Sequence, residues 1–204
     1  IIDTGTTSVQ LTLKMEAAAR SAGITFLDSP MTGSKMAAAN GQILFMVGGQ
    51  PDQIESIRYF FDSCGKGVIH CGPVSSGQRT KIALNMVQAG LLQVYLEGFQ
   101  LASKDGIKAD TLLSVLKSSA AASPILDFKM GCVLKQDFDA HFALKNMNKD
   151  LNHAMSRAKE VHAALPLSSA LKPIYDAGMA AGFADEDFCS LAKVMADFNR
   201  NQLD

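Results

Sequence analysis

Charged residues are scarce in this sequence, and those of one sign do not cluster. They make up 19% of the 204 residues, with a formal net charge of -1. A protein that binds nucleic acid by its surface charge needs a patch or stripe of Lys and Arg, so the composition argues against a polyanion as partner. Hydrophobic residues make up 48% of the chain, which is enough for the core of one large domain or two small ones.

Cysteine and long apolar runs are scarce too. The four cysteines contain no Cys-x-x-Cys pair, so we expect neither a metal site nor a disulfide framework, and free thiols in a reducing cytosol instead. No apolar run approaches the roughly 20 residues that span a bilayer, and the N-terminus shows no signal-peptide pattern. These absences predict a cytoplasmic protein without a membrane partner.

Several motifs of nucleotide binding and catalysis are also absent. The sequence has no Gly-x-Gly-x-x-Gly loop and no Gly-x-Ser-x-Gly elbow, and its histidines show no ligand spacing. Segment 72–77 places two glycines before a predicted helix, as a P-loop does. Gln78 and Arg79 follow, however, where a P-loop needs Lys and Ser or Thr. We therefore interpret these glycines as the exit of the chain from a sheet into a helix.

Up to about residue 73, apolar runs alternate with helical patterns. The sequence predicts helices at 7–22 and 51–64, and strands at 1–2, 24–27, 43–47 and 68–70. Continuous apolar strands between helices favour a mostly parallel sheet that is covered on both faces. Because the chain opens on a strand-like Ile-Ile pair and not on Met, we expect it to begin inside a domain.

After Gly77 the pattern is helical throughout. A long helix is predicted from about 78 to 104, and further helices near 109–118, 123–135, 142–163, 167–181 and 187–199. The sequence therefore predicts two domains, a partial α/β domain over 1–73 and an all-α domain over 74–204, with the long helix connecting them.

Lys81 and Asn85 are the strongest candidates for chemistry. Their spacing puts an ammonium and a carboxamide on one face of the long helix. A solvated surface lysine is the usual alternative, but Ile82, Leu84 and Val87 make this helix apolar on most sides, so the lysine must snorkel, pair or line a cleft. A lysine in a cleft can exchange a proton near neutral pH, and an asparagine beside it can hold an oxygen without adding charge.

The segment Thr32-Gly33-Ser34 is a second candidate. It follows the predicted strand 24–27 across Pro30, and ligands of parallel sheets gather at the carboxyl ends of strands. Hydroxyl and backbone N–H groups there suit a carboxylate. The alternative is an ordinary loop in which Thr and Ser bond to their own backbone.

Lys149 and Asp150 form a third candidate, inside the helix predicted over 142–163. As adjacent residues they point in different directions and are consistent with plain helix surface. Lys145 lies four residues before Lys149, and this like-charge pair would be relieved by a bound anion. Both interpretations stay open at this point.

Taken together, these segments resemble the β-hydroxyacid dehydrogenase family, which includes 3-hydroxyisobutyrate dehydrogenase, tartronate semialdehyde reductase and glyoxylate/succinic semialdehyde reductases. The resemblance covers essentially the whole chain and rests on ordered motifs at 1–6, 28–34, 72–85, 142–151 and 181–188. For example, Asp-Ser-Pro-Met-Thr-Gly-Ser at 28–34 is similar to the family's Asp-Ala-Pro-Val-Ser-Gly-Gly. The resemblance implies a partial Rossmann-type α/β sheet, a long connecting helix and an all-α C-terminal domain.

The resemblance also implies roles for the candidate residues. Lys81 would be the general acid/base in hydride transfer between NAD or NADP and a small hydroxy acid or semialdehyde. Asn85 would orient the substrate. The remaining substrate-binding residues would be Thr32, Gly33 and Ser34, and the cofactor-binding residues would be Thr6, Lys149 and Asp150. A homodimer or tetramer would form through the helical domain.

The sequence departs from the family pattern in places. Thr32 stands where Ser is usual, Ser34 replaces the second Gly of its motif, and Gly5 replaces a Ser. The portion that would carry the Gly-rich turn and the ribose selector is not in the sequence, so neither NAD nor NADP is favoured. Two hypotheses follow: an NAD(P)-dependent dehydrogenase, or a truncated, non-catalytic binding or oligomerisation module derived from this family.

Overall fold

The computed structural model describes residues 1–201, and its internal contacts divide the chain into two compact units. Unit 1 comprises 1–85 and 159–161, and unit 2 comprises 86–158 and the residues from 162 onward. This division falls within the long helix, whereas the domain boundary between residues 73 and 74 stays a prediction.

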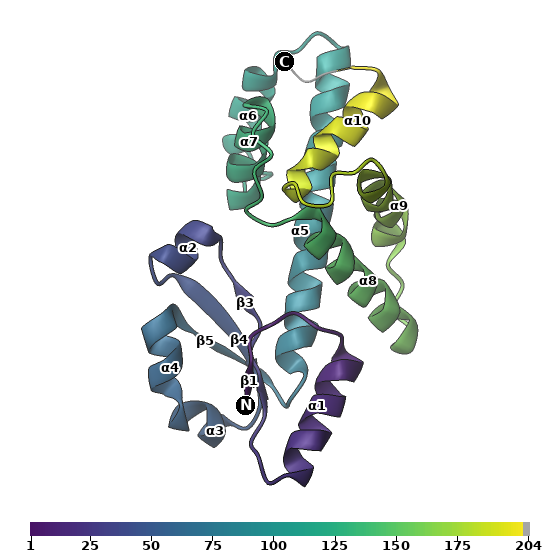
Figure 1. Ribbon diagram of the computed structural model, residues 1–204. Helices are drawn as coiled ribbons and strands as arrows, with labels where there is room; N and C mark the ends of the chain where they lie inside the picture. The colour runs from purple at the N-terminus through teal and green to yellow at the C-terminus, as the bar shows by residue number, and fades with distance from the viewer. Residues whose placement is uncertain (202–204) are drawn as a thin grey trace. The chain divides into compact units, whose positions relative to one another are not determined.

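Unit 1 is a five-stranded sheet with four helices (Figure 1). The strands are β1 (Ile2–Asp3), β2 (Leu27–Asp28), β3 (Met31–Thr32), β4 (Ile43–Gly48) and β5 (Gly65–Gly72). The helices are α1 (Val9–Ser21), α2 (Lys35–Ala39), α3 (Pro51–Ser56) and α4 (Arg58–Cys64). The strand order is β1-β2-β4-β3, and β5 also pairs with β4.

The sheet is mixed, so the expectation of a mostly parallel sheet is wrong. β1 is parallel to β2 and β4 to β5, but β2 and β3 both run antiparallel to β4. The return from β3 to β4 is short, because segment 33–42 contains only the five-residue α2. A parallel connection needs a crossover of a dozen or more residues, so this return makes the two strands antiparallel.

The core of unit 1 lies between the sheet and its helices. Figure 1 shows α1 on one side of the sheet and α3 and α4 on the other. Phe45 of β4 packs against Phe61 of α4 with ring centres 5.1 Å apart, and both are buried with Val47. The helix predicted over 51–64 is interrupted at Ile57, where φ is -118°.

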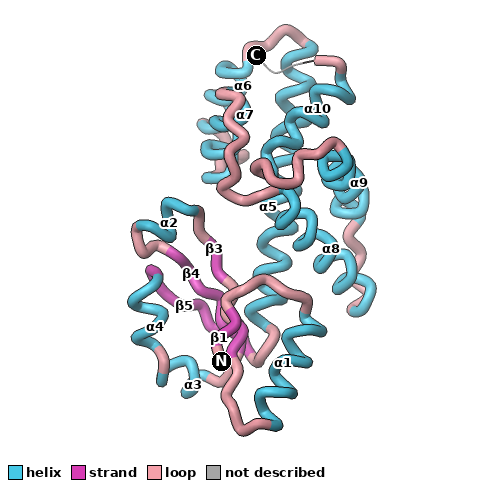
Figure 2. The backbone as a smooth tube through the Cα atoms, viewed as in Figure 1, coloured by secondary structure: helices cyan, strands magenta, loops and turns pink. Residues whose placement is uncertain are grey.

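Unit 2 is built from helices, as predicted. They are α5 (Ser76–Lys104, whose first turns belong to unit 1), α6 (Ala109–Lys117), a π-helical turn (Leu126–Met130), α7 (Gly131–Leu134), α8 (Leu144–Glu160), α9 (Pro166–Ala180), a 3-10 turn (Phe188–Ser190) and α10 (Leu191–Asn199). Over the described part of the chain, no strand follows β5 (Figure 2). An isolated bridge joins Ala143 and Asp187. These observations confirm the predicted fold class.

The core of unit 2 surrounds the second part of α5. Figure 1 shows α6 and α7 on one side of this helix, α8 and α9 on the other, and α10 crossing it. Leu92, Leu96 and Phe99 of α5 are fully buried, as are Leu151 of α8 and Tyr175 of α9. None of the helices formed by residues 1–201 is long and apolar enough to cross a membrane.

Candidate functional site

The first turns of α5 carry three buried polar side chains on one face. Gln78, Lys81 and Asn85 are spaced at three and then four residues, which places them in line along the helix. Their exposed fractions are 0%, 7% and 1%. The helix thus puts Lys81 and Asn85 on a common face, as predicted, and burial of Lys81 contradicts the alternative of a solvated surface lysine.

The buried carboxylate of Asp28 caps the start of this helix. Its Oδ1 accepts a hydrogen bond from the backbone N–H of Ser75 at 2.6 Å, and its Oδ2 accepts one from that of Gln78 at 2.8 Å. Amide groups at a helix start have no partner within the helix and favour negative charge. Strand pairing places Asp28 opposite both Asp3 and Gly48, so the sheet fixes the cap.

The Asp28 side chain is fully buried. Burial raises the pKa of this carboxyl above its ordinary value of 3.8, although the two backbone N–H groups oppose the rise. The backbone of two glycines also lies very close to its neighbours. A Cβ at Gly48 would lie 2.3 Å from Asp28 Oδ1, and one at Gly77 would lie 2.3 Å from the carbonyl oxygen of Met46. Glycine is therefore required at both positions for the helix to begin against the sheet.

Thr6 lies in the segment between β1 and α1, which Gln78 contacts with its side chain. Gln78 Nε2 donates to the carbonyl oxygen of Gly5 at 2.8 Å, and Gln78 Oε1 accepts from the backbone N–H of Thr7 at 3.1 Å. The two bonds flank Thr6 on both sides. The predicted cofactor contact is thus tied to the helix that carries Lys81.

Thr32 lies within β3, so the predicted loop is a strand that leads directly into a helix cap. Gly33 has φ +145°, and a Cβ there would lie 2.7 Å from Ile43 Cδ1. The Ser34 hydroxyl accepts from the backbone N–H of Ala37 at 3.2 Å and so caps α2. This cap gives a structural reason for Ser at position 34, and its hydroxyl hydrogen can still be donated.

The substrate-binding candidates lie past the carboxyl end of β2. Asp28 pairs with Gly48 and Thr32 with Leu44, which separates them by roughly 13 Å along β4 at the usual rise of a strand. Because β2 is parallel to β1 and antiparallel to β4, Thr32 lies beside the beginning of β4 and on the side of the sheet toward which β1 and β2 run.

In unit 2, Asp150 is buried, whereas Lys149 lies on the exposed surface of α8. Asp150 is 1% exposed, and its Oδ1 lies 3.2 Å from Nζ of Lys149, a side chain that is 44% exposed. Lys145 forms an ion pair with Asp185. Each lysine thus has a carboxylate that offsets its charge, and a bound anion that relieves their repulsion stays a prediction. Burial, followed by the charge of Lys149, lowers the pKa of His153 one turn further on.

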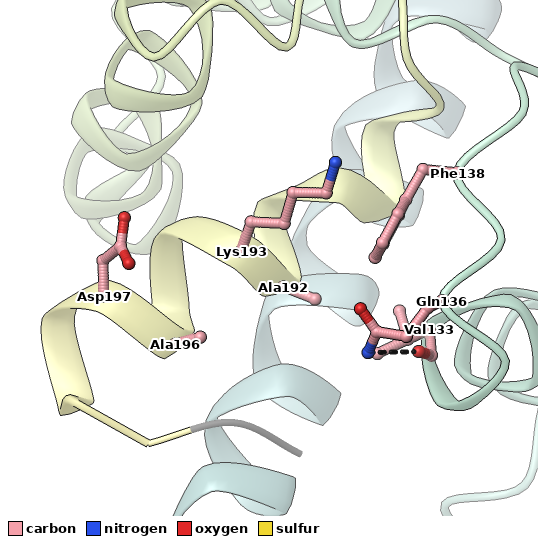
Figure 3. Close-up of a pocket in the computed structure, with 7 residues that line it drawn as sticks. All are labelled: Val133, Gln136, Phe138, Ala192, Lys193, Ala196 and Asp197. Carbon is pink, nitrogen blue, oxygen red and sulfur yellow. Dashed lines mark hydrogen bonds between the residues drawn. The ribbon is translucent and has the colours of Figure 1, made fainter. Parts of the chain in front are cut away.

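A small pocket in unit 2 has a volume of about 130 Å³ and lies between α10 and the segment around α7 (Figure 3). Its ammonium group belongs to Lys193, which pairs with Glu186 at 2.7 Å and lies 4.3 Å from the centre of the Phe138 ring. Because this charge is already compensated, we assign no chemistry to the pocket. Within residues 1–201 there is no group of three or more His, Cys, Asp or Glu that could hold a metal ion.

Comparison with known families gives two matches in chain order. Residues 1–72 match the NAD-binding domain of 6-phosphogluconate dehydrogenase. Residues 75–195, more than half of the chain, match the NAD-binding region of NADP-dependent 3-hydroxyisobutyrate dehydrogenase. The chain belongs to the β-hydroxyacid dehydrogenase family. Membership confirms the resemblance seen in the sequence motifs.

Individual members of the β-hydroxyacid dehydrogenase family match most of the chain. Glyoxylate/succinic semialdehyde reductase 2, chloroplastic, of Arabidopsis thaliana is 27% identical over 95% of this chain and 54% of its own length. A probable 3-hydroxyisobutyrate dehydrogenase of Mycobacterium tuberculosis is 33% identical over 93% of this chain and 67% of its own. The chain thus spans between about half and two thirds of the length of these relatives.

A solved member of the family has the same fold. The structure of Mycobacterium tuberculosis 3-hydroxyisobutyrate dehydrogenase with L-serine superimposes with a TM-score of 0.87 at 32% identity. The match covers 95% of this chain and 69% of that one. The fold expected of a family member is therefore the fold observed.

Two buried polar residues, Asp28 and Gln78, were not selected from the sequence as site residues. Asp28 opens the family-like motif at 28–34, and Gln78 lies three residues before Lys81 on the same helix face. These were the available signals. Their contacts depend on segments about fifty and seventy residues apart in the chain, which no local pattern reveals.

Proposed function

We propose that this chain carries the acid–base and substrate-binding residues of an NAD(P)-dependent hydroxyacid dehydrogenase. The observation that carries the proposal is the buried face of Gln78, Lys81 and Asn85 at the start of α5. An ammonium and a carboxamide one turn apart, held in a water-poor setting, suit proton exchange with a carbonyl or hydroxyl oxygen. Family membership supports the same chemistry.

The proposed proton donor is Lys81. Its Nζ gives a proton to the carbonyl oxygen during reduction and takes one from the hydroxyl group during oxidation. Asn85 donates a hydrogen bond from its amide to the same oxygen and adds no charge. Bound NAD(P) supplies or accepts the hydride. The Thr32 hydroxyl and the Gly33 N–H bind the substrate carboxylate, with the Ser34 hydroxyl beside them.

Thr6 is the proposed cofactor-binding residue of unit 1, and Lys149 is that of unit 2. These donors fit a nicotinamide nucleotide, since Thr6 offers a hydroxyl in a segment fixed by Gln78. The Lys149 ammonium is partly exposed and so suits an anionic group of the ligand. Asp150 is buried against Lys149 and would fix the position of its ammonium.

The substrate class we propose is a small carboxylate that also carries an aldehyde or a primary alcohol. Relatives are named for glyoxylate and succinic semialdehyde, for 2-(hydroxymethyl)glutarate, for L-serine and for 3-hydroxyisobutyrate. All of these compounds share that pair of groups. The stiff methyl group of Thr32, in place of a serine, narrows the space beside the carboxylate.

We also propose that copies of the chain associate through unit 2, as a homodimer or tetramer. The observation that favours it is a stripe of exposed apolar side chains on α5, formed by Val87, Val94 and Leu101 at seven-residue spacing. Such a repeat suits packing against another helix. Light scattering that gives one chain per particle at high concentration would exclude this association.

Direct titration tests the proposed function. The 204-residue chain is mixed with NADH or NADPH, and nicotinamide fluorescence is followed before each of the five named compounds or its oxidised partner is added. We expect saturation at a dissociation constant on the order of 1 μM to 1 mM, the range usual for substrates of enzymes, followed by turnover. No saturation and no turnover would favour the alternative of a non-catalytic binding or oligomerisation module.

A further inference from the structure

Gln78 joins three parts of unit 1 that are distant in sequence. Its side chain bonds to Gly5 and Thr7, on either side of Thr6. Its backbone N–H bonds to Asp28, four residues before Thr32. Its own helix carries Lys81 one turn later. One residue that is 0% exposed thus connects Thr6, Asp28 and the helix that carries Lys81. These are the predicted cofactor contact, the residue that precedes the substrate segment and the proposed proton donor.

The chemistry of the side chain matters as much as its position. One partner, the carbonyl oxygen of Gly5, only accepts a hydrogen bond, and the other, the backbone N–H of Thr7, only donates one. A primary amide supplies a donor and an acceptor side by side. The partners therefore fix which side-chain atom is oxygen and which is nitrogen. Methionine fills a similar volume but makes neither bond.

We propose that Gln78 is a positioning residue that sets Thr6 relative to Lys81. The two side-chain bonds act as a short backbone-like bridge between the segment after β1 and the first turn of α5. Misplacing a contact group by about 1 Å can cost on the order of a hundredfold in rate, so a fixed Thr6 matters for hydride transfer. This inference rests on the proposed function for the role of Thr6, but the bridge itself does not.

The bridge is tested first by hydrogen exchange at the Thr7 amide, in the 204-residue chain without cofactor or substrate. In Gln78→Met we expect Thr7 protection to fall at least about tenfold, because its acceptor is lost, while the buried Val47 in β4 keeps its protection. Gln88→Met, further along the same helix, is the matched control and should leave Thr7 unchanged. Unchanged Thr7 protection in Gln78→Met would overturn the proposal.

Gln78→Glu adds a readout that a purely space-filling role would not move. A carboxyl group at position 78 keeps an oxygen that accepts from the Thr7 N–H, and its protonated form also has a donor for Gly5, whereas methionine offers neither. At about pH 5, where burial favours the protonated form, Thr7 protection in Gln78→Glu should therefore exceed that in Gln78→Met by at least about tenfold after correction for intrinsic exchange rates. Equal Thr7 protection in the two variants would contradict the bridge.

Kinetics then separate this inference from the proposed function. Where the unchanged chain transfers hydride, Gln78→Met should lower kcat about tenfold to a hundredfold, because Thr6 moves. The KM for the carboxylate substrate should change less than about twofold, because the Asp28 bond uses only the backbone of residue 78. A rise in that KM with kcat unchanged would refute the positioning role. Absence of any turnover would count against the proposed function and leave the exchange result standing.

Discussion

At the scale of single residues, Gly33 is a sensitive point of the candidate site. Its φ of +145° is rarely adopted by other residues, and an added Cβ would lie 2.7 Å from Ile43 Cδ1. Gly33→Ala should therefore move the backbone N–H that we assign to the substrate carboxylate. We expect the KM for a carboxylate substrate to rise about tenfold or more, the loss of roughly one charge-assisted hydrogen bond.

Gly41→Ala is the matched control for this prediction, because Gly41 also has a positive φ but no neighbour within 4 Å of an added Cβ. Both variants then place alanine at a positive φ, and only Gly33→Ala adds a clash next to Thr32 and Ser34. An equal rise in KM for both variants would mean that the effect is not local to the carboxylate contact.

A second residue-scale prediction concerns the buried ion pair of Asp187 and Lys129 in unit 2. Lys129 Nζ lies 2.8 Å from both carboxylate oxygens, and the backbone N–H groups of His141, Phe142 and Cys189 donate to Asp187 as well. Burial alone would raise the pKa of Asp187, but the charge of Lys129 and these hydrogen bonds hold it below its ordinary value of 3.8. The ionised Asp187 carboxylate thus stabilises the folded state at pH values above its ordinary pKa of 3.8.

Asp187→Asn should lower the free energy of unfolding by about 3–5 kcal/mol at neutral pH, because it leaves the Lys129 charge buried without its partner. The difference in free energy of unfolding between Asp187→Asn and the unchanged chain should shrink as the pH falls below about 4. At that end of the pH range Asp187 of the unchanged chain becomes protonated first in the unfolded state and then, at its depressed pKa, in the folded state. Urea unfolding at several pH values measures this. A constant difference down to about pH 2 would contradict the account.

At the scale of elements, the start of α5 depends on a close approach of backbone to backbone. A Cβ at Gly77 would lie 2.3 Å from the Met46 carbonyl oxygen, whereas one at Gly98, within the same helix, would meet nothing within 4 Å. Gly77→Ala should therefore lower the free energy of unfolding by about 1–3 kcal/mol through steric strain. Gly98→Ala should raise it by about 0.5–1 kcal/mol through helix propensity.

Urea unfolding of the two glycine variants, followed by circular dichroism, distinguishes these outcomes. Similar stability changes of the same sign in the two variants would show that close packing of Gly77 against β4 does not limit the start of α5. The comparison also bears on function, because Lys81 lies one turn after Gly77 and would shift with the start of α5.

The elements themselves were largely predictable from sequence, and the reasons for the exceptions are physical. Ser8 caps α1 and Gly23 follows it with φ +70°, so the helix predicted over 7–22 formed where local signals placed it. The direction of β3 against β4 was not predictable in this way. It depends on the short return through α2, and five-residue helices leave little periodic signal.

At the scale of the whole molecule, the sequence pattern predicted an α/β part followed by helices, and the fold and family confirm it. Lys81 and Asn85 could be selected because helical spacing is local information. Asp28 and Gln78 could not, because their importance depends on strand pairing and on contacts across the sheet. The roles assigned to the site residues stay predictions until they are measured.

The most direct test of the central claim is the single-turnover rate of hydride transfer in the chain and in Lys81→Met, with Lys14→Met on the exposed side of α1 as control. Nicotinamide absorbance reports the rate after an aldehyde substrate is mixed with the bound, reduced cofactor. If Lys81 is the proton donor, its loss lowers the rate about 10²–10⁴-fold, while cofactor affinity and the Lys14→Met rate stay within about twofold of the unchanged chain. A Lys81→Met rate equal to that of the unchanged chain would contradict the assignment.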